Sequence, residues 1–246
     1  MRVRNRLLNF GNYIIYQDDD YFSFSLDSLL LANFVTIKLR DKKILDLCTG
    51  NAPIPMLLSF KTKASIIGLE LQKEIFCLGE DSVKENGLDS QINLVLGDVM
   101  DSKDYFDSES FDIVTCNPPY FKYKEGSLIN DNYVKTVARH EVKIKLDDIL
   151  SNASYLLKNG GTFAMVHRPD RLMEIIDVFK KYKIEPKKIR FVYPKMGTEA
   201  NILLIEGIKN GNTGLKILPP LISHNEDGSY TDEIRLMFGG DNDVAD

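Results

Sequence analysis

The sequence predicts an α/β fold in which helices cover both faces of a mostly parallel sheet. Short apolar runs rich in β-branched residues alternate with longer helical stretches, which is the pattern of successive strand–helix units. Asp46, Glu70, Asp98 and Asn117 stand at or near the ends of four of these runs. Because the carboxyl ends of parallel strands meet at one edge of a sheet, where such folds bind ligands, we expect these four side chains to share a site.

The composition is that of an ordinary globular protein. The chain has 246 residues, of which 43% are hydrophobic and 27% charged, enough for one large α/β domain with small extensions. We expect the main domain at 26–210, an N-terminal β extension at 1–25, and a tail at 211–246 that packs on the domain and frays at its acidic end. The net charge of −5 does not by itself indicate nucleic-acid binding, because domains of that kind are commonly basic.

The sequence predicts neither a membrane protein nor a metal protein. Its apolar stretches are shorter than a bilayer span, and the segment Met1–Arg4 lacks the apolar core of a secretory signal. We therefore expect a cytoplasmic protein without a membrane partner. The three cysteines, Cys48, Cys77 and Cys116, form no CxxC or Cys/His pair, which argues against a metal site and a disulfide framework. Cys48 and Cys116 end predicted strands, so we expect buried, reduced thiols there.

The first 34 residues predict a hairpin followed by a buried helix. Alternation at 13–16 and at 22–24, on either side of the acidic turn 18–20, is typical of a small hairpin laid on the main domain. The apolar stretch 29–34 then predicts a helix, with Ser25 or Asp27 as its N-cap.

Residues 43–48 predict a strand, and the small-residue turn 49–55 opens a helix, since Pro53 is well tolerated in a first helical turn. A loop of this kind is where a doubly wound sheet holds its cofactor. The loop lacks a phosphate-binding fingerprint, which favours a ligand without a pyrophosphate group. Asp46 is placed either to meet a ligand ammonium group or to hold the loop in shape.

Two further strands are predicted at 64–69 and 92–96, with an amphipathic helix from Gln72 to Asn86 between them. Glu70 ends the first of these strands about twenty residues past the small-residue loop, a position suited to binding two ribose hydroxyls. A solvated strand end or a helix cap is the alternative role for this carboxylate.

The tetrapeptide Asn117-Pro118-Pro119-Tyr120 follows the predicted buried strand 111–116. Each proline fixes its own φ and lacks an N–H, so the segment is stiff and presents carbonyl acceptors without competing donors. A rigid row of acceptors suits an amino group as ligand. Asn117 offers a side-chain carbonyl, Pro118 a backbone carbonyl, and Tyr120 a flat face for stacking. The alternative is a proline-rich strand exit with an exposed tyrosine.

Asn-Pro-Pro-Tyr resembles the catalytic motif of S-adenosyl-L-methionine-dependent methyltransferases that modify an amino nitrogen conjugated to a ring or carbonyl. The resemblance covers roughly residues 20–210 and implies a Rossmann-like, seven-stranded, mostly parallel sheet with a reversed last strand, for which 189–193 and 201–206 are the antiparallel candidates. It also implies that the glycine-rich loop consensus is reduced here, with Cys48 and Ala52 in place of glycines. The residues it places at the cofactor are Asp27, Asp46, Thr49, Gly50, Glu70, Asp98, Val99 and Asn117.

The stretch 121–138 is long and poor in periodic apolar positions, so we interpret it as a flap that orders on substrate, with an idle excursion as the alternative. The candidate substrate contacts are Tyr120, Phe121, Lys122, Lys124, Arg139 and His140. His140 is not needed as a general base, so we expect a structural or RNA-contacting role for it and for Arg139. The basic run 180–190 is a solvated face or, together with Arg2, Arg4, Arg6, Lys122 and Lys124, a candidate phosphate-tracking surface.

Three features together resemble the bacterial family of adenine-N6 methyltransferases that act next to the anticodon of a valine tRNA: Phe-Ser-Phe-Ser-Leu-Asp at 22–27, the motif at 117–121, and Leu-Lys-Ile-Leu-Pro-Pro-Leu at 215–221. This resemblance implies RNA, namely a tRNA anticodon loop, as partner. The alternatives are a glutamine-N5 protein methyltransferase, an rRNA guanine-N2 methyltransferase, and a scaffold that only binds the cofactor.

Overall fold

The computed structural model describes residues 2–7, 12–18, 25–118 and 144–239. The strands are β1 (Arg2–Arg6), β2 (Ile14–Asp18), β3 (Lys43–Leu47), β4 (Ser65–Glu70), β5 (Ile92–Leu96), β6 (Phe111–Cys116), β7 (Leu157–His167), β8 (Ile184–Tyr193), β9 (Ile202–Lys209), β10 (Lys216–Ile217) and β11 (Leu221–Ile222). The α-helices are α1 (Leu26–Phe34), α2 (Pro53–Ser59), α3 (Lys73–Glu85), α4 (Ser102–Tyr105), α6 (Leu146–Leu156), α7 (Leu172–Lys181) and α8 (Asp232–Met237). Short 3₁₀ turns lie at Val99–Asp101 and Pro169–Arg171.

The main sheet has the order β10-β8-β9-β7-β6-β3-β4-β5, and β11 also pairs with β8. Strands β3 to β7 pair in parallel, whereas β9 runs antiparallel between β7 and β8. The predicted α/β fold with a reversed last strand is thereby confirmed. The seven predicted strands correspond to β3–β9, but within the described residues the sheet has nine strands. The extra two come from the tail, which continues along β8 with Leu218 N–H donating to the Ile189 carbonyl at 2.8 Å.

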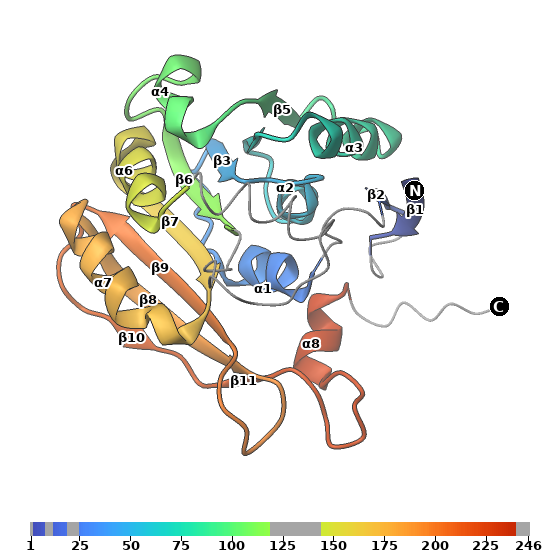
Figure 1. The fold of residues 1–246 in the computed structure, drawn as a ribbon, viewed down its shortest axis with the longest axis vertical. Helices are drawn as coiled ribbons and strands as arrows, with labels where there is room; N and C mark the ends of the chain where they lie inside the picture. Colours follow the sequence, from blue (N-terminus) through green and yellow to red (C-terminus); the bar gives the residue numbers. More distant parts are fainter. Residues whose placement is uncertain (1, 8–11, 19–24, 119–143, 240–246) are drawn as a thin grey trace, which may run out of the picture.

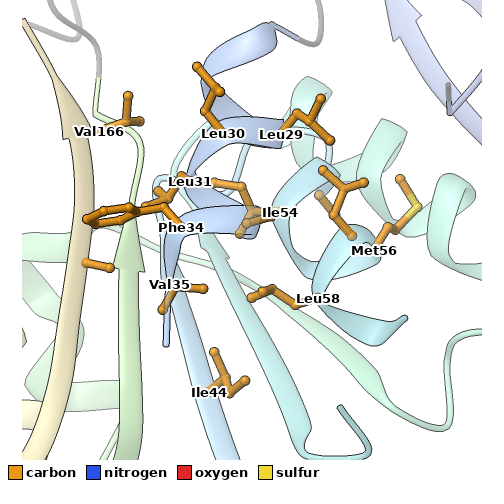
Figure 2. Packing of buried hydrophobic residues seen from close by; sticks show 14 of the residues in the cluster. Leu29, Leu30, Leu31, Phe34, Val35, Ile44, Ile54, Met56, Leu58 and Val166 are labelled. Atoms are coloured by element: carbon orange, nitrogen blue, oxygen red, sulfur yellow. The ribbon is translucent and has the colours of Figure 1, made fainter. Parts of the chain in front are cut away.

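Helices cover both faces of this sheet (Figure 1). Each face has its own apolar core. On one face, α1 and α2 pack on the sheet through side chains such as Leu31, Ile54 and Leu58, next to Ile44 of β3 (Figure 2). On the other face, α6 and α7 bury residues such as Leu150 and Phe179. Because the central strands are covered on both sides, they are apolar almost throughout, as parallel strands of this class are.

The N-terminal strands β1 and β2 form an antiparallel pair. The predicted strand at 13–16 corresponds to β2, but its partner is β1 and not the predicted 22–24, which lies outside the described residues. The pair is held on α3 by side chains that complete its backbone hydrogen bonds. The Asn86 amide accepts from Ile14 N–H at 2.8 Å and donates to the Ile14 carbonyl at 2.7 Å. Tyr16 N–H donates to Ser82 Oγ at 2.9 Å. The extension is therefore joined to the main domain by directional contacts that belong to β2.

The cysteines are free thiols, with Cys116 buried, Cys48 half-buried and Cys77 exposed. The prediction of a buried thiol holds for Cys116 and is wrong for Cys48, which lies in the loop after β3 and is half-buried. Among the described residues, no helix has both the length and the apolar character needed to cross a bilayer.

Candidate active site

The loop after β3 has a left-handed backbone at alternate residues. The φ angles of Cys48, Gly50 and Ala52 are 56°, 61° and 67°. These are the three positions at which the glycine-rich consensus has glycine, and a side chain in this conformation costs roughly 1–2 kcal/mol. The backbone shape that the consensus favours is therefore present although two of its glycines are replaced. Thr49 N–H donates to the Leu69 carbonyl at 3.0 Å, which ties the loop to the end of β4.

Asp46 lies beneath this loop with no exposed surface. Its carboxylate accepts from Thr49 Oγ1 at 2.7 Å and from Thr115 Oγ1 at 2.6 Å. Burial raises the pKa of Asp46 to about 7, against the lowering effect of the two hydroxyls. Asp46 thus contacts the loop through the Thr49 hydroxyl, which is the second of the two roles predicted for it. Through Thr115 it also joins the loop to β6.

Glu70 at the end of β4 is 6% exposed and faces the same loop. Its Oε2 accepts from Gly50 N–H at 2.9 Å, and its Oε1 accepts from Gln72 N–H at 2.9 Å. Burial raises the pKa of Glu70, although these backbone N–H groups oppose the rise. A carboxylate oxygen has more than one acceptor site, so Glu70 can hold the loop and still accept from a ligand hydroxyl.

Gly68 in β4 allows the loop to lie close to the sheet. A Cβ at this position would come within 2.8 Å of Thr49 Cγ2 and 2.7 Å of Leu94 Cδ2. Contacts this short do not occur between real side chains, so any other residue at 68 would displace Thr49 or Leu94.

Asp98 follows β5 at the same edge and is half-buried. Its carboxylate accepts from Met100 N–H at 3.0 Å, and Val99 beside it is buried. Gly97 N–H donates to the Glu70 carbonyl at 2.8 Å, which connects the ends of β4 and β5. The predicted sharing of one sheet edge by Asp46, Glu70 and Asp98 is therefore what the structure shows.

Asn117 directly follows β6, next to β3 in the sheet, with Pro118 buried after it. Asn117 Nδ2 donates to Ser28 Oγ of α1 at 3.2 Å. Asp27, in the first turn of α1, precedes that serine. Ser25 is the N-cap residue, as predicted, but its side chain makes no capping hydrogen bond. The first turn of α1 is instead closed by a backbone hydrogen bond from Ser28 N–H to the Ser25 carbonyl at 3.2 Å.

The predicted contacts Tyr120, Phe121, Lys122, Lys124, Arg139 and His140 lie outside the described residues. Sequence reasoning missed Ser28 and Thr115, which hold Asn117 and Asp46 respectively. It also missed Asn51, whose Nδ2 donates to the Tyr16 carbonyl at 2.7 Å and so joins the loop to β2. The one sequence signal for these residues is a polar side chain inside or beside an otherwise apolar run.

Carboxylates accompany many of the basic residues considered for phosphate tracking. Lys188 pairs with Glu206 at 3.1 Å, and Arg190 pairs with Glu233 at 2.6 Å. Other pairs are Lys181–Asp147, Arg2–Asp81 and Arg4–Glu85. These pairings favour the solvated-face alternative for the basic residues they involve.

Residues 22–193 match the model of the family described as the methyltransferase small domain. The chain belongs to this family. It is a methyltransferase, and its methyl donor is S-adenosyl-L-methionine. The predicted resemblance to methyltransferases is thereby confirmed.

Curated relatives match the chain along most of its length, and a solved structure has a similar fold. The chain is 25% identical over 231 residues to a tRNA1(Val) (adenine(37)-N6)-methyltransferase of Bacteroides fragilis (strain YCH46), covering 93% of this chain and 96% of the relative. It is 27% identical over 237 residues to a protein of the same name from Actinobacillus pleuropneumoniae serotype 5b (strain L20), covering 96% of each. Its fold is similar to that of a predicted O-methyltransferase from Agrobacterium tumefaciens, with a TM-score of 0.70 and 23% identity over 87% of this chain and 96% of that one.

The residues at the sheet edge fit this cofactor. Glu70 offers buried carboxylate oxygens beside the loop, as a ribose diol requires, and Asp98 offers a half-buried acceptor next to apolar Val99. The loop at 48–52 contains no lysine or arginine. It therefore places no positive charge next to a ligand whose reactive end is cationic.

Proposed function

We propose that the protein transfers the methyl group of S-adenosyl-L-methionine to an exocyclic amino nitrogen, namely N6 of an adenine in tRNA. One observation carries the proposal: Asn117, the first residue of Asn-Pro-Pro-Tyr, stands at the carboxyl end of β6, beside the loop that closes over Asp46. The names of the curated relatives, which match nearly the whole chain, support adenine-N6 and tRNA.

Each cofactor-binding residue has a role suited to its position. Glu70 would hold the ribose hydroxyls, while Asp98 accepts from the adenine amino group and Val99 packs on its ring. Asp46, Thr49 and Gly50 would shape the loop around the amino acid end. Asp27, in the first turn of α1, would face that end. When bound, the cofactor supplies an electrophilic methyl group on a sulfonium.

The substrate amine is handled by Asn117 and Pro118. Asn117 Oδ1 and the Pro118 carbonyl each accept one amino hydrogen, which turns the nitrogen lone pair out of conjugation with the ring. The nitrogen becomes a better nucleophile and would take the methyl group as the methyl–sulfur bond breaks, with the electrons of that bond left on sulfur. The N–H proton becomes acidic as the new bond forms and would pass to water, so no dedicated base is required. Catalysis rests on positioning and on acceptors fixed before the reaction.

The base must leave its loop to reach this site. An unpaired adenine in an anticodon loop is extruded at a cost of a few kcal/mol and stacks on an aromatic side chain, for which Tyr120 is the candidate. Phe121, Lys122, Lys124, Arg139 and His140 are the candidates for further RNA contacts. With a tRNA substrate, we expect the enzyme to act in the cytoplasm.

Nucleoside mass spectrometry tests this function. Purified enzyme with S-adenosyl-L-methionine should form N6-methyladenosine in unmodified tRNA, and tRNA from a strain lacking the gene should have lost that nucleoside. Asn117→Ala should abolish transfer while changing cofactor affinity by less than a few-fold. Methylation of guanine N2 in rRNA, or of glutamine in a protein, in place of adenine would refute the assignment. Binding heat with the cofactor, but no methyl transfer to any of these substrates, would favour the scaffold that only binds the cofactor.

A further inference from the structure

Ser28 contacts the side chain that the proposed reaction depends on. It lies in α1, 4% exposed, and its Oγ accepts from Asn117 Nδ2 at 3.2 Å. The two residues are 89 positions apart in the sequence, so the contact exists only because α1 packs beside the end of β6.

The side-chain amide of asparagine accepts hydrogen bonds through Oδ1 and donates them through Nδ2, and these two atoms point in different directions. With Nδ2 turned to Ser28, the Oδ1 of Asn117 is turned away from α1. If the amide were flipped, its N–H groups would point where an amino substrate also presents N–H groups, and donor would meet donor. The orientation of this amide therefore decides whether Asn117 accepts from the substrate or repels it.

Ser28 itself is held in place by its helix. The neighbouring residues Leu29, Leu30 and Leu31 are buried, and Figure 2 shows them packed in the apolar layer that α1 shares with α2. Backbone N–H of Ser28 donates to the Ser25 carbonyl at 3.2 Å. The hydroxyl that receives the Asn117 amide is therefore attached to a helix that the core fixes against the sheet.

We propose that Ser28 is a positioning residue that orients the Asn117 amide so that Oδ1 faces the substrate amine. The proposal rests on the proposed function, since it assumes an amine as methyl acceptor. The proposal gives α1, which precedes β3, a part in catalysis. This helix supplies the hydrogen-bond acceptor that sets the direction of the Asn117 amide.

The test compares Ser28→Ala and Ser28→Thr with a matched control, Ser59→Ala. Ser59 is also a buried helix serine of the same apolar layer, 7% exposed, but its Oγ donates to the Met56 carbonyl at 2.7 Å. Ser28→Ala should lower kcat by about 3- to 10-fold, the range that one net hydrogen bond sets, with KM for the cofactor changed less than two-fold. Ser28→Thr should restore most of kcat, and Ser59→Ala should leave it unchanged.

A second readout does not depend on the substrate. The side-chain amide ¹H–¹⁵N signals of Asn117, assigned by their loss in Asn117→Ala, should shift in Ser28→Ala and stay unchanged in Ser59→Ala. Unchanged Asn117 signals in Ser28→Ala, or an unchanged kcat there, would overturn the positioning role. If the unmodified enzyme forms no N6-methyladenosine while the signals do shift, the proposed adenine substrate fails and the orienting contact stands.

Discussion

Replacing Asp46 with asparagine should make the cofactor-free protein more stable at alkaline pH. The carboxylate is fully buried and its pKa is raised from 3.8 to about 7, chiefly by burial. Asparagine has nearly the same shape. Its Oδ1 can accept from Thr49, and its Nδ2 can donate to Thr115 Oγ1, whose own proton can turn to the Leu45 carbonyl at 3.5 Å.

The sign and size of the effect follow from proton linkage. Between the unfolded and folded pKa values of Asp46, 3.8 and about 7, the folded protein binds the proton and the unfolded chain does not. Stability is therefore lost as pH rises through this window, at about 1.4 kcal/mol per pH unit. From about pH 5 to about pH 8 the wild-type protein should lose about 2–3 kcal/mol relative to Asp46→Asn.

Urea unfolding followed by far-UV circular dichroism measures this difference, and the absence of tryptophan makes that probe preferable to fluorescence. Both proteins are unfolded without cofactor at several pH values across the window. Parallel stability curves for the wild-type protein and Asp46→Asn would refute the buried-carboxylate reasoning. A variant equally destabilised at every pH would show instead that the two threonine contacts outweigh the charge.

Three further changes test other parts of the structure. Asp112→Asn should destabilise the protein by about 1 kcal/mol at neutral pH, because contacts from Lys158 and backbone N–H groups outweigh burial and lower the pKa of this carboxyl; in urea titrations the loss should shrink as pH falls through that pKa, and a constant loss would contradict it. Gly68→Ala should weaken cofactor binding by about tenfold in calorimetry, because its Cβ displaces Thr49; unchanged affinity would show that the loop tolerates the shift. Asn86→Ala should cost about 1–3 kcal/mol and expose β1 and β2 to limited proteolysis, unless their apolar contacts hold them alone.

The arrangement of the main sheet was predictable because its strands are buried on both faces and read as continuous apolar runs. The reversed pair β8 and β9 followed from the short connection between two such runs. The strands β10 and β11 were not predicted, because each has two residues and Pro219 and Pro220 separate them. Strands of two residues have no periodicity that a sequence could reveal. They form here because the edge of β8 that faces away from β9 is free to pair with them.

The site was predictable to the extent that topology fixes it. Asp46, Glu70, Asp98 and Asn117 follow from the rule that parallel strands end together. The partners Ser28 and Thr115 depend on which helix face meets which strand, and no local pattern encodes that. The carboxylates that pair with Lys188 and Arg190 come from distant segments of the chain. The basic run at 180–190 therefore predicted a more positive surface than the folded protein has.

The turn at 48–52 has a consequence for finding related enzymes. Its backbone is left-handed at Cys48 and Ala52 as well as at Gly50, although the first two carry side chains where the consensus has glycine. Hydrogen bonds to Leu69 and Glu70 at the end of β4 hold it there, and Gly68 leaves the space that Thr49 occupies. A search that demands three glycines would pass over this chain, whereas a comparison of backbone torsion angles would retain it.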